Sequence, residues 1–182
     1  GADFFSKHAG SFRTSAWSNL ATLAQSLGRF GLAERLHLGA LRWDPDLAES
    51  WNNLANALLS QGRHAQAVGC YLAALSKTES SQIRYNLGRA LVLSGREDEG
   101  RPELERADRE GAIPDAANDL GLLELKAGRA KEAVRIFEAL LSRDPEYALA
   151  YYNLAVAREI LGDKAAAKEA FARFEELRVL AK

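Results

Sequence analysis

Few residues of this chain have the type and spacing that catalysis or metal binding requires. The three histidines, His8, His37 and His64, stand far apart, and Cys70 is the only cysteine. Zinc sites and metalloproteases need ligands at short fixed spacings, which these residues do not have. The sequence also contains neither a phosphate-binding GxxxxGK[ST] loop nor a GxSxG nucleophile turn. We therefore predict that the protein is not an enzyme and holds no metal and no cofactor.

The polar side chains that do recur are amides. An asparagine or an aspartate stands directly before a leucine in five segments, at Asn19, Asn53, Asn86, Asp119 and Asn153. An amide offers both donors and an acceptor, which suits the backbone of an extended peptide whatever its sequence. If the five side chains share one surface, they form a ladder for such a ligand.

The elements that must position this ladder follow from a repeat. A glycine stands nine residues after each ladder position, at Gly28, Gly62, Gly95, Gly128 and Gly162, so the glycines are 33 or 34 residues apart. A fixed period in this range is typical of stacked helical repeats. Apolar residues recur at helical spacing on both sides of each glycine, and glycine readily adopts the left-handed conformation that ends a helix. We predict five pairs of helices, over residues 14–47, 48–80, 81–113, 114–147 and 148–181.

Two of these repeats carry a fuller pattern. The second has it at Trp51, Leu54, Ala55, Gly62, Ala67, Tyr71 and Ala74, and the fourth at Leu120, Gly121, Gly128, Ala133, Phe137 and Pro145. The pattern resembles that of the tetratricopeptide repeat family. The resemblance covers residues 14–181. It implies an all-α fold, a right-handed superhelical solenoid of antiparallel helix pairs that acts as a non-enzymatic scaffold.

Three repeats depart from the family pattern. His37 takes the second aromatic position of the first repeat, and Phe174 takes the last small position of the fifth. In the third repeat Arg84 replaces the first aromatic residue, while Gly100 and Pro102 fall within the second helix. Glycine and proline both weaken a helix interior. We therefore predict a kinked and less ordered helix over residues 95–113.

The resemblance places the amide ladder on the concave groove of the solenoid, where family members bind protein segments. The residues that it assigns to a peptide-binding groove are Asn19, Asn53, Asn56, Tyr85, Asn86, Arg89, Asn118, Asp119, Tyr152 and Asn153, with Ser18, Thr22 and Asn52 on the same surface. The ladder resembles that of O-linked N-acetylglucosamine transferase repeat regions. A second interpretation remains open, in which the amides bond a neighbouring helix or the backbone.

Other partners are less well supported. A net charge of −1 gives no general attraction to nucleic acid. No apolar run approaches the roughly 20 residues that cross a bilayer, so we expect no membrane insertion by this segment. Ser18 and Thr22 stand where chaperone-tail binders of the family carry a lysine and an asparagine, so we predict no site for a chaperone C-terminus.

The chain contains no methionine, not even at position 1. An untouched translation product begins with one, so we expect a processed chain or a fragment of a larger or membrane-anchored protein. The alternative function is accordingly a substrate-recruiting or assembly domain of a larger enzyme such as a glycosyltransferase. The compartment stays open, with the cytoplasm preferred.

The two ends of the chain fall outside the regular pattern. Residues 1–13 are interpreted either as a cap, with a short helix that carries Phe4 and Phe5, or as the remnant of a preceding repeat. The last helix carries an apolar series, Phe171, Phe174, Leu177 and Leu180, although a terminal repeat normally needs a solvated outer face. We therefore expect possible self-association through the C-terminal helix.

Overall fold

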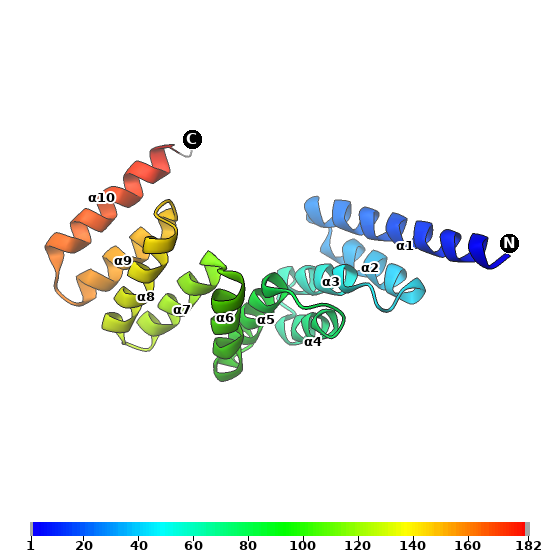
Figure 1. Ribbon diagram of the computed structural model, residues 1–182, viewed down its shortest axis with the longest axis horizontal. Helices are drawn as coiled ribbons and strands as arrows, with labels where there is room; N and C mark the ends of the chain where they lie inside the picture. Colours follow the sequence, from blue (N-terminus) through cyan, green and yellow to red (C-terminus); the bar gives the residue numbers. More distant parts are fainter. Residues whose placement is uncertain (1, 181–182) are drawn as a thin grey trace. The chain divides into compact units, whose positions relative to one another are not determined.

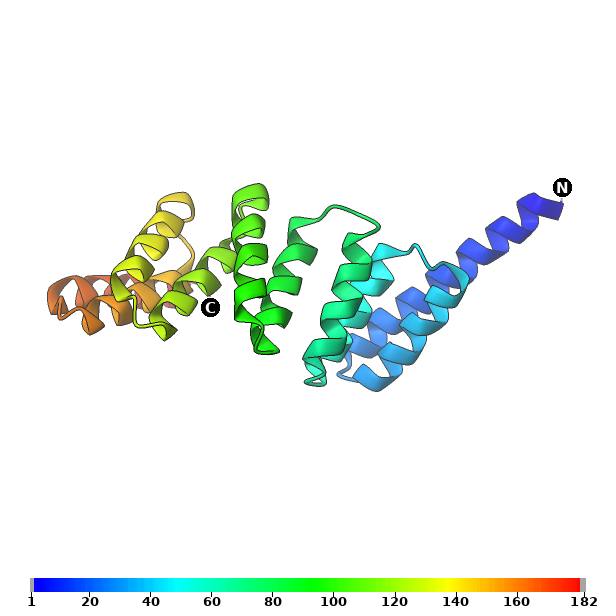
Figure 2. The ribbon, with the colours of Figure 1, turned by 90° about the horizontal axis from the view of Figure 1, so that it is seen from below.

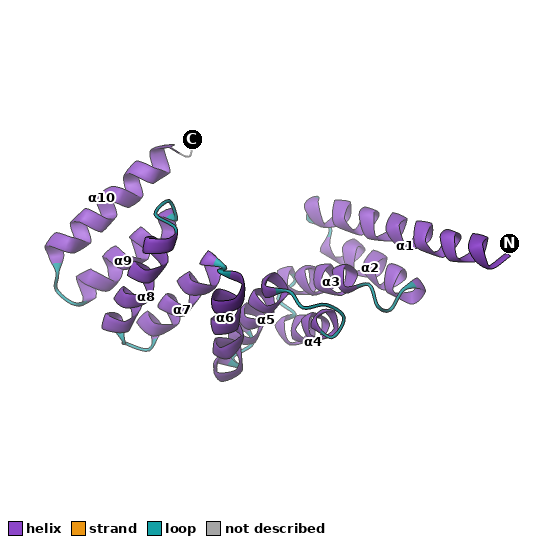
Figure 3. Cartoon of the chain, viewed as in Figure 1, coloured by secondary structure: helices purple, strands orange, loops and turns teal. Residues whose placement is uncertain are grey.

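The computed structural model describes the backbone of residues 2–180 and the side chains of residues 14–180, and every element in this range is an α-helix (Figures 1 and 3). The ten helices are α1 (Ala2–Ser26), α2 (Phe30–Trp43), α3 (Ala48–Ser60), α4 (His64–Leu75), α5 (Ser81–Leu93), α6 (Glu97–Gly111), α7 (Pro114–Lys126), α8 (Ala130–Arg143), α9 (Ala148–Ile160) and α10 (Lys164–Leu180). They form two compact units, residues 1–103 and 104–182, with the division inside α6.

Each repeat is a pair of antiparallel helices joined by a tight turn (Figure 2). The turn glycines all have positive φ angles, 70° at Gly28, 74° at Gly62, 82° at Gly95, 74° at Gly128 and 80° at Gly162. This left-handed conformation is strained for a residue with a Cβ atom, which explains why glycine recurs at this place. The prediction of an all-α fold built from helix pairs is therefore confirmed.

The core of each unit lies between neighbouring pairs. In the first unit it gathers around Tyr71, which is fully buried with Leu54 and Leu87 in one cluster. In the second unit Phe137 takes the same place, beside Leu140 and Leu154. The pairs pack closely because small residues stand where helices cross. A Cβ atom on Gly121, for example, would lie 2.4 Å from the Phe137 ring.

The third repeat shows how its departures from the pattern are accommodated. The guanidinium of Arg84 is buried, and it donates hydrogen bonds to Glu79 at 2.8 Å and to Glu103 at 2.9 Å. Gly100 lets α6 approach α5, because a Cβ atom there would lie 2.7 Å from the carbonyl oxygen of Gly88. Helix α6 runs on through Pro102 as one element. Lower order in this segment stays a prediction.

The N-terminal segment differs from the separate short helix that we expected. Residues 2–13 belong to α1, which runs without a break into the first repeat. The prediction of a short helix was therefore wrong, since no turn separates it from the first repeat. The side chains of residues 1–13, which would distinguish a cap from a remnant repeat, lie outside the described side chains.

Replacing Gly100 with alanine tests the close approach of α6 to α5. We expect the Gly100→Ala variant to lose about 2 kcal/mol of unfolding free energy, because the methyl group meets backbone and cannot be accommodated without a shift. Gly69, inside α4, is the matched control, because a Cβ atom there has no neighbour within 4 Å. Gly69→Ala should stabilise the protein by about 1 kcal/mol. Urea unfolding followed by circular dichroism measures both, and equal effects would contradict the packing described.

His37 predicts a pH dependence of stability. The ring is fully buried, and neither nitrogen has a hydrogen-bond partner among the described residues. Burial therefore lowers the pKa of His37 from 6.5 to about 4. Between these values the unfolded chain binds the proton and the folded chain does not, so stability falls as the pH drops from about 6.5 to 4.

The total loss from this group is about 3 kcal/mol. A His37→Phe variant, which places the same ring as Phe137 at the equivalent position, should lack this part of the pH dependence. Unfolding free energies of the two proteins measured from pH 7 to 4 give the difference directly. Parallel curves would show that His37 is protonated in the folded protein or is accessible to water.

Candidate functional site

All seven asparagines of the chain lie on the first helices of their pairs. With Asp119 they form a set that we call the amide face: Asn19, Asn52, Asn53, Asn56, Asn86, Asn118, Asp119 and Asn153. Most of these side chains are half-buried, whereas Asn19 is exposed and Asn118 is buried. The amide face is divided between the two units, with Asn118, Asp119 and Asn153 in the second.

In the first unit the amides of neighbouring repeats bond to one another. The Nδ2 atom of Asn86, on α5, donates to Oδ1 of Asn52, on α3, at 3.3 Å. Asn52 in turn donates to Oδ1 of its neighbour Asn53 at 3.2 Å. The second unit repeats this link, since Asn153 on α9 donates to Oδ1 of Asn118 on α7 at 2.7 Å. In both units the amide before the leucine therefore reaches back to the preceding first helix.

These hydrogen bonds use only part of each amide. Within the first unit the Nδ2 group of Asn53 and the Oδ1 atom of Asn86 have no partner among the described residues. In the second unit the same holds for the Nδ2 group of Asn118 and the Oδ1 atom of Asn153. Each linked set thus retains one unpaired NH2 group and one unpaired carbonyl oxygen for another molecule.

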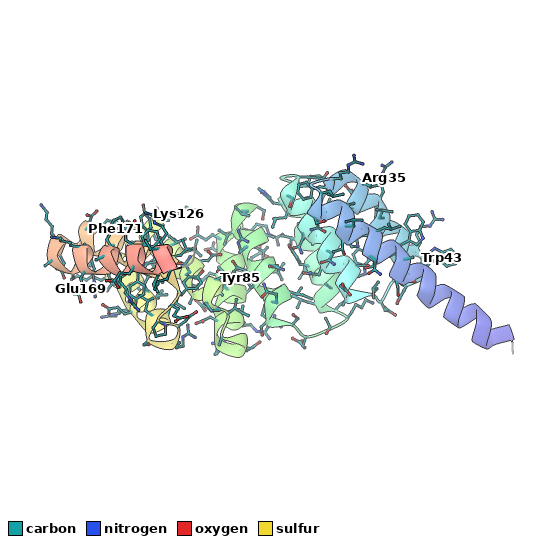
Figure 4. All side chains as sticks on the ribbon, turned by 90° about the horizontal axis from the view of Figure 1, so that it is seen from above. Arg35, Trp43, Tyr85, Lys126, Glu169 and Phe171 are labelled. Atoms are coloured by element: carbon teal, nitrogen blue, oxygen red, sulfur yellow. The ribbon has the colours of Figure 1, made fainter. Side chains whose placement is uncertain are left out.

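Aromatic residues border the amides in the first unit. Tyr71 donates a hydrogen bond from its hydroxyl to Oδ1 of Asn56 at 2.5 Å, and burial raises the pKa of this tyrosine. The guanidinium of Arg89 lies 5.6 Å from the ring centre of Tyr85, which is within the range of a cation–π interaction. Tyr85 is buried while Arg89 is exposed, so the charge rather than the ring is accessible. Figure 4 labels Tyr85 on α5.

In the second unit the exposed residue Tyr152 belongs to a cluster of three rings. Its ring centre lies 6.2 Å from that of Phe171 and 5.4 Å from that of Phe174, and the two phenylalanines are 5.9 Å apart. Both phenylalanines come from α10, which packs beside α9 (Figure 1). Sequence reasoning assigned Tyr152 to the groove but did not foresee this cluster, because a terminal repeat gives no signal of how its last helix will sit.

The structure brings part of the predicted site together. Asn53 and Asn86 are linked through Asn52, which lay on the predicted surface but outside the predicted set. Asn118 and Asn153 meet directly, whereas Asn19 is exposed at the first repeat. The sequence signal that could have identified Asn52 is its position directly before the ladder residue Asn53. The hydrogen bonds between amides show that these residues have a structural role as well.

Other chemistry-bearing groups lie apart from the amide face. Cys70 is half-buried against the first core cluster, and burial raises the pKa of its thiol, with a smaller effect from Glu34. Among residues whose side chains are described, no three of histidine, cysteine, aspartate and glutamate gather as metal ligands. No described helix combines the length and the apolar character needed to cross a membrane.

Solved structures with the same arrangement of helices include pilF from Pseudomonas aeruginosa, at a TM-score of 0.81 and 20% identity over 92% of this chain and 78% of that one. The MamA fragment 41-end from Desulfovibrio magneticus RS-1 gives a TM-score of 0.78 and 20% identity over 91% of this chain and 95% of that one. YrrB, described as a TPR protein with an unusual peptide-binding site, gives a TM-score of 0.67 and 24% identity over 88% of this chain and 84% of that one. These similarities show the fold.

The sequence itself carries the family pattern. The model of the tetratricopeptide repeat family matches residues 18–82, 53–117 and 118–178. No curated protein matches the chain in sequence. The family matches reach across all five predicted repeats, and the resemblance drawn from the repeat pattern is confirmed. The chain belongs to the tetratricopeptide repeat family.

Proposed function

We propose that the protein is a non-catalytic interaction scaffold in which the amides of each unit bind an extended segment of a peptide or protein. The observation that carries this proposal is the incomplete pairing of the amides. In each unit, one amide NH2 group and one amide carbonyl oxygen remain unpaired after the hydrogen bonds between neighbouring repeats have formed. A peptide backbone presents the complementary acceptor and donor at every residue, so it can bond both without a specific sequence.

The hydrogen bonds between amides also favour binding by fixing the side chains in advance. A free asparagine loses rotamer freedom when it binds a ligand, and this loss weakens affinity. The bonds from Asn86 to Asn52 and from Asn153 to Asn118 hold these side chains before any ligand arrives. The structural role of the amides and their proposed binding role are therefore compatible.

Two features would add to backbone recognition. Arg89, placed over Tyr85, offers an exposed positive charge beside the amides of the first unit. Tyr152 offers a partly exposed ring beside the amides of the second unit. Tyrosine and arginine side chains tend to contribute most of the binding energy at protein interfaces. YrrB, a similar structure described as having a peptide-binding site, supports a role of this class. The predicted groove residue Asn19 would extend the surface of the first unit, and Asp119 that of the second.

A double substitution of Asn53 and Asn86 tests the proposal. The probe is a peptide selected against the wild-type chain from a random display library, and its dissociation constant is measured by calorimetry. We expect the Asn53→Ala/Asn86→Ala variant to bind this peptide on the order of tenfold or more weakly, because about 1 kcal/mol is lost with each hydrogen bond. Helicity measured by circular dichroism should be unchanged.

Gln66→Ala is the matched control, since it removes an exposed amide from the second helix α4, away from the amide face. This control should bind like the wild-type protein. If the double variant keeps full affinity while its unfolding free energy falls, the amides serve only to join repeats. Failure of a diverse library to yield any binder would also contradict the proposal.

A further inference from the structure

The first helix of the chain leaves open a face that every later first helix buries. On α3, α5 and α9, three positions (the third, seventh and tenth of the repeat) pack toward the preceding pair. At α3, α5, α7 and α9 the residues in these positions are at most 8% exposed: Ser50, Leu54, Ala57, Ile83, Leu87, Ala90, Ala116, Leu120, Leu123, Ala150, Leu154 and Ala157. On α1 the same positions include Leu20, 55% exposed, and Leu23, 56% exposed.

The last pair leaves open the complementary face. Position 24 of the repeat is fully buried at Tyr71 and Phe137, but its counterpart Phe171 is 44% exposed. Beside it lies a cleft of about 360 Å³ between α9 and α10, lined by Tyr152, Ala155, Val156, Glu159, Lys164, Ala167, Lys168 and Phe171. Ala155 and Ala167 are buried here, as their equivalents Gly121 and Ala133 are in the preceding pair, so the two pairs differ at the aromatic position, where Phe137 is fully buried.

The contact between α8 and α9 shows what such a face receives. There Leu154 and Ala157 of the incoming first helix join the cluster of Ala133, Phe137 and Leu140. Leu20 and Leu23 of α1 occupy the positions of Leu154 and Ala157, while Ala167 and Phe171 occupy those of Ala133 and Phe137. The two open faces therefore lie at the repeat positions that form the two halves of one internal junction.

A cleft on α1 and α2 gives a second and independent match. It measures about 570 Å³ and is lined by Trp17, Arg35, Leu38, Gly39, Arg42 and Trp43. A cleft of about 680 Å³ between α8 and α10 is lined, among others, by the equivalent residues Tyr151, Glu169, Ala172, Arg173 and Glu176. The cleft at α2 is thus equivalent to the cleft between α8 and α10. It lacks one side, which α8 supplies in the second cleft through Glu138, Leu141 and Ser142 and which we call the α8 wall.

The charges indicate what would supply the missing wall. Arg35 and Arg42 have no carboxylate partner among the described residues, and Figure 4 shows Arg35 on the edge of its helix pair. On α10 the residues equivalent to the α8 wall are Ala172, Glu175 and Glu176. Both glutamates are held only in exposed pairs three residues apart, at 2.6 Å from Arg178 and 2.8 Å from Arg173. Exposed pairs of this kind cost little to exchange.

From these observations we propose that two copies of the chain associate head to tail. The head face, which is Leu20, Leu23, Arg35 and Arg42 with Trp17, packs on the tail face, which is Tyr152, Phe171, Glu175 and Glu176. The leucines of one copy enter the cleft between α9 and α10 of the next, while Glu175 and Glu176 face Arg35 and Arg42. The internal ion pair of Arg63 with Glu34 has a repulsive counterpart here, Arg29 with Lys168, but both of these side chains are exposed and screened by salt.

A contact between two different faces is heterologous, so a pair of copies still has one free head and one free tail, to which further copies can add. This separates the proposal from a symmetric dimer through the C-terminal helix, in which α10 would pack on another α10. It also differs from peptide binding, because it shares only Tyr152 with the residues proposed to bind a peptide and leaves the amides of Asn53 and Asn86 untouched.

The experiment uses one variant for each face. Leu20→Glu/Leu23→Glu blocks the head and Phe171→Glu blocks the tail; the three side chains are exposed, so both variants should keep wild-type helicity by circular dichroism. Sedimentation velocity over a wide concentration range should show association of the wild-type chain and monomers for each variant alone. An equal mixture of the two variants should form a dimer that grows no further, because each contributes one intact face.

Leu93→Glu, at a leucine that is 50% exposed on α5, is the matched control and should associate like the wild type. Arg42→Glu should weaken association on the order of tenfold, and adding Glu176→Arg to the same chain should restore it. A wild-type monomer at all concentrations would overturn the proposal. So would association of either blocked variant by itself, or a mixture that stays monomeric.

Discussion

The structure depends on the burial of one stripe of small and apolar residues on each of the first helices α3, α5 and α9 against the pair before it. This contact needs a close approach of backbones, which explains the small residues at the crossing points. Gly100 allows α6 to meet the backbone of α5, and Gly121 makes room for the ring of Phe137. Burial of apolar surface drives the packing, and the glycines permit the distance at which it becomes effective.

The same contact determines which side chains remain for function. Once the stripe is buried, the polar residues beside it lie at the borders between repeats, where Asn86 reaches Asn52 and Asn153 reaches Asn118. A repeat array therefore produces regularly spaced amides as a result of its own packing. At the ends the contact is unfinished, which leaves Leu20 and Phe171 exposed and leads to the proposed association of copies.

The sequence predicted the helices and their turns well, because a positive-φ glycine and an apolar period are local signals. It could not predict the pairing of amides, since Asn52 becomes important only through a residue 34 positions away, Asn86. Nor could it show the benefit of Gly100, which local propensity counts only as a weakness. Arg84 is a similar case, as its carboxylate partners Glu79 and Glu103 lie on different elements.

The most direct test of the central claim is a crystal structure of the chain with a selected peptide bound. The account predicts an extended peptide whose backbone accepts a hydrogen bond from Nδ2 of Asn53 and donates one to Oδ1 of Asn86. A peptide seated on the second helices, with the amides of Asn53 and Asn86 facing only water, would contradict it.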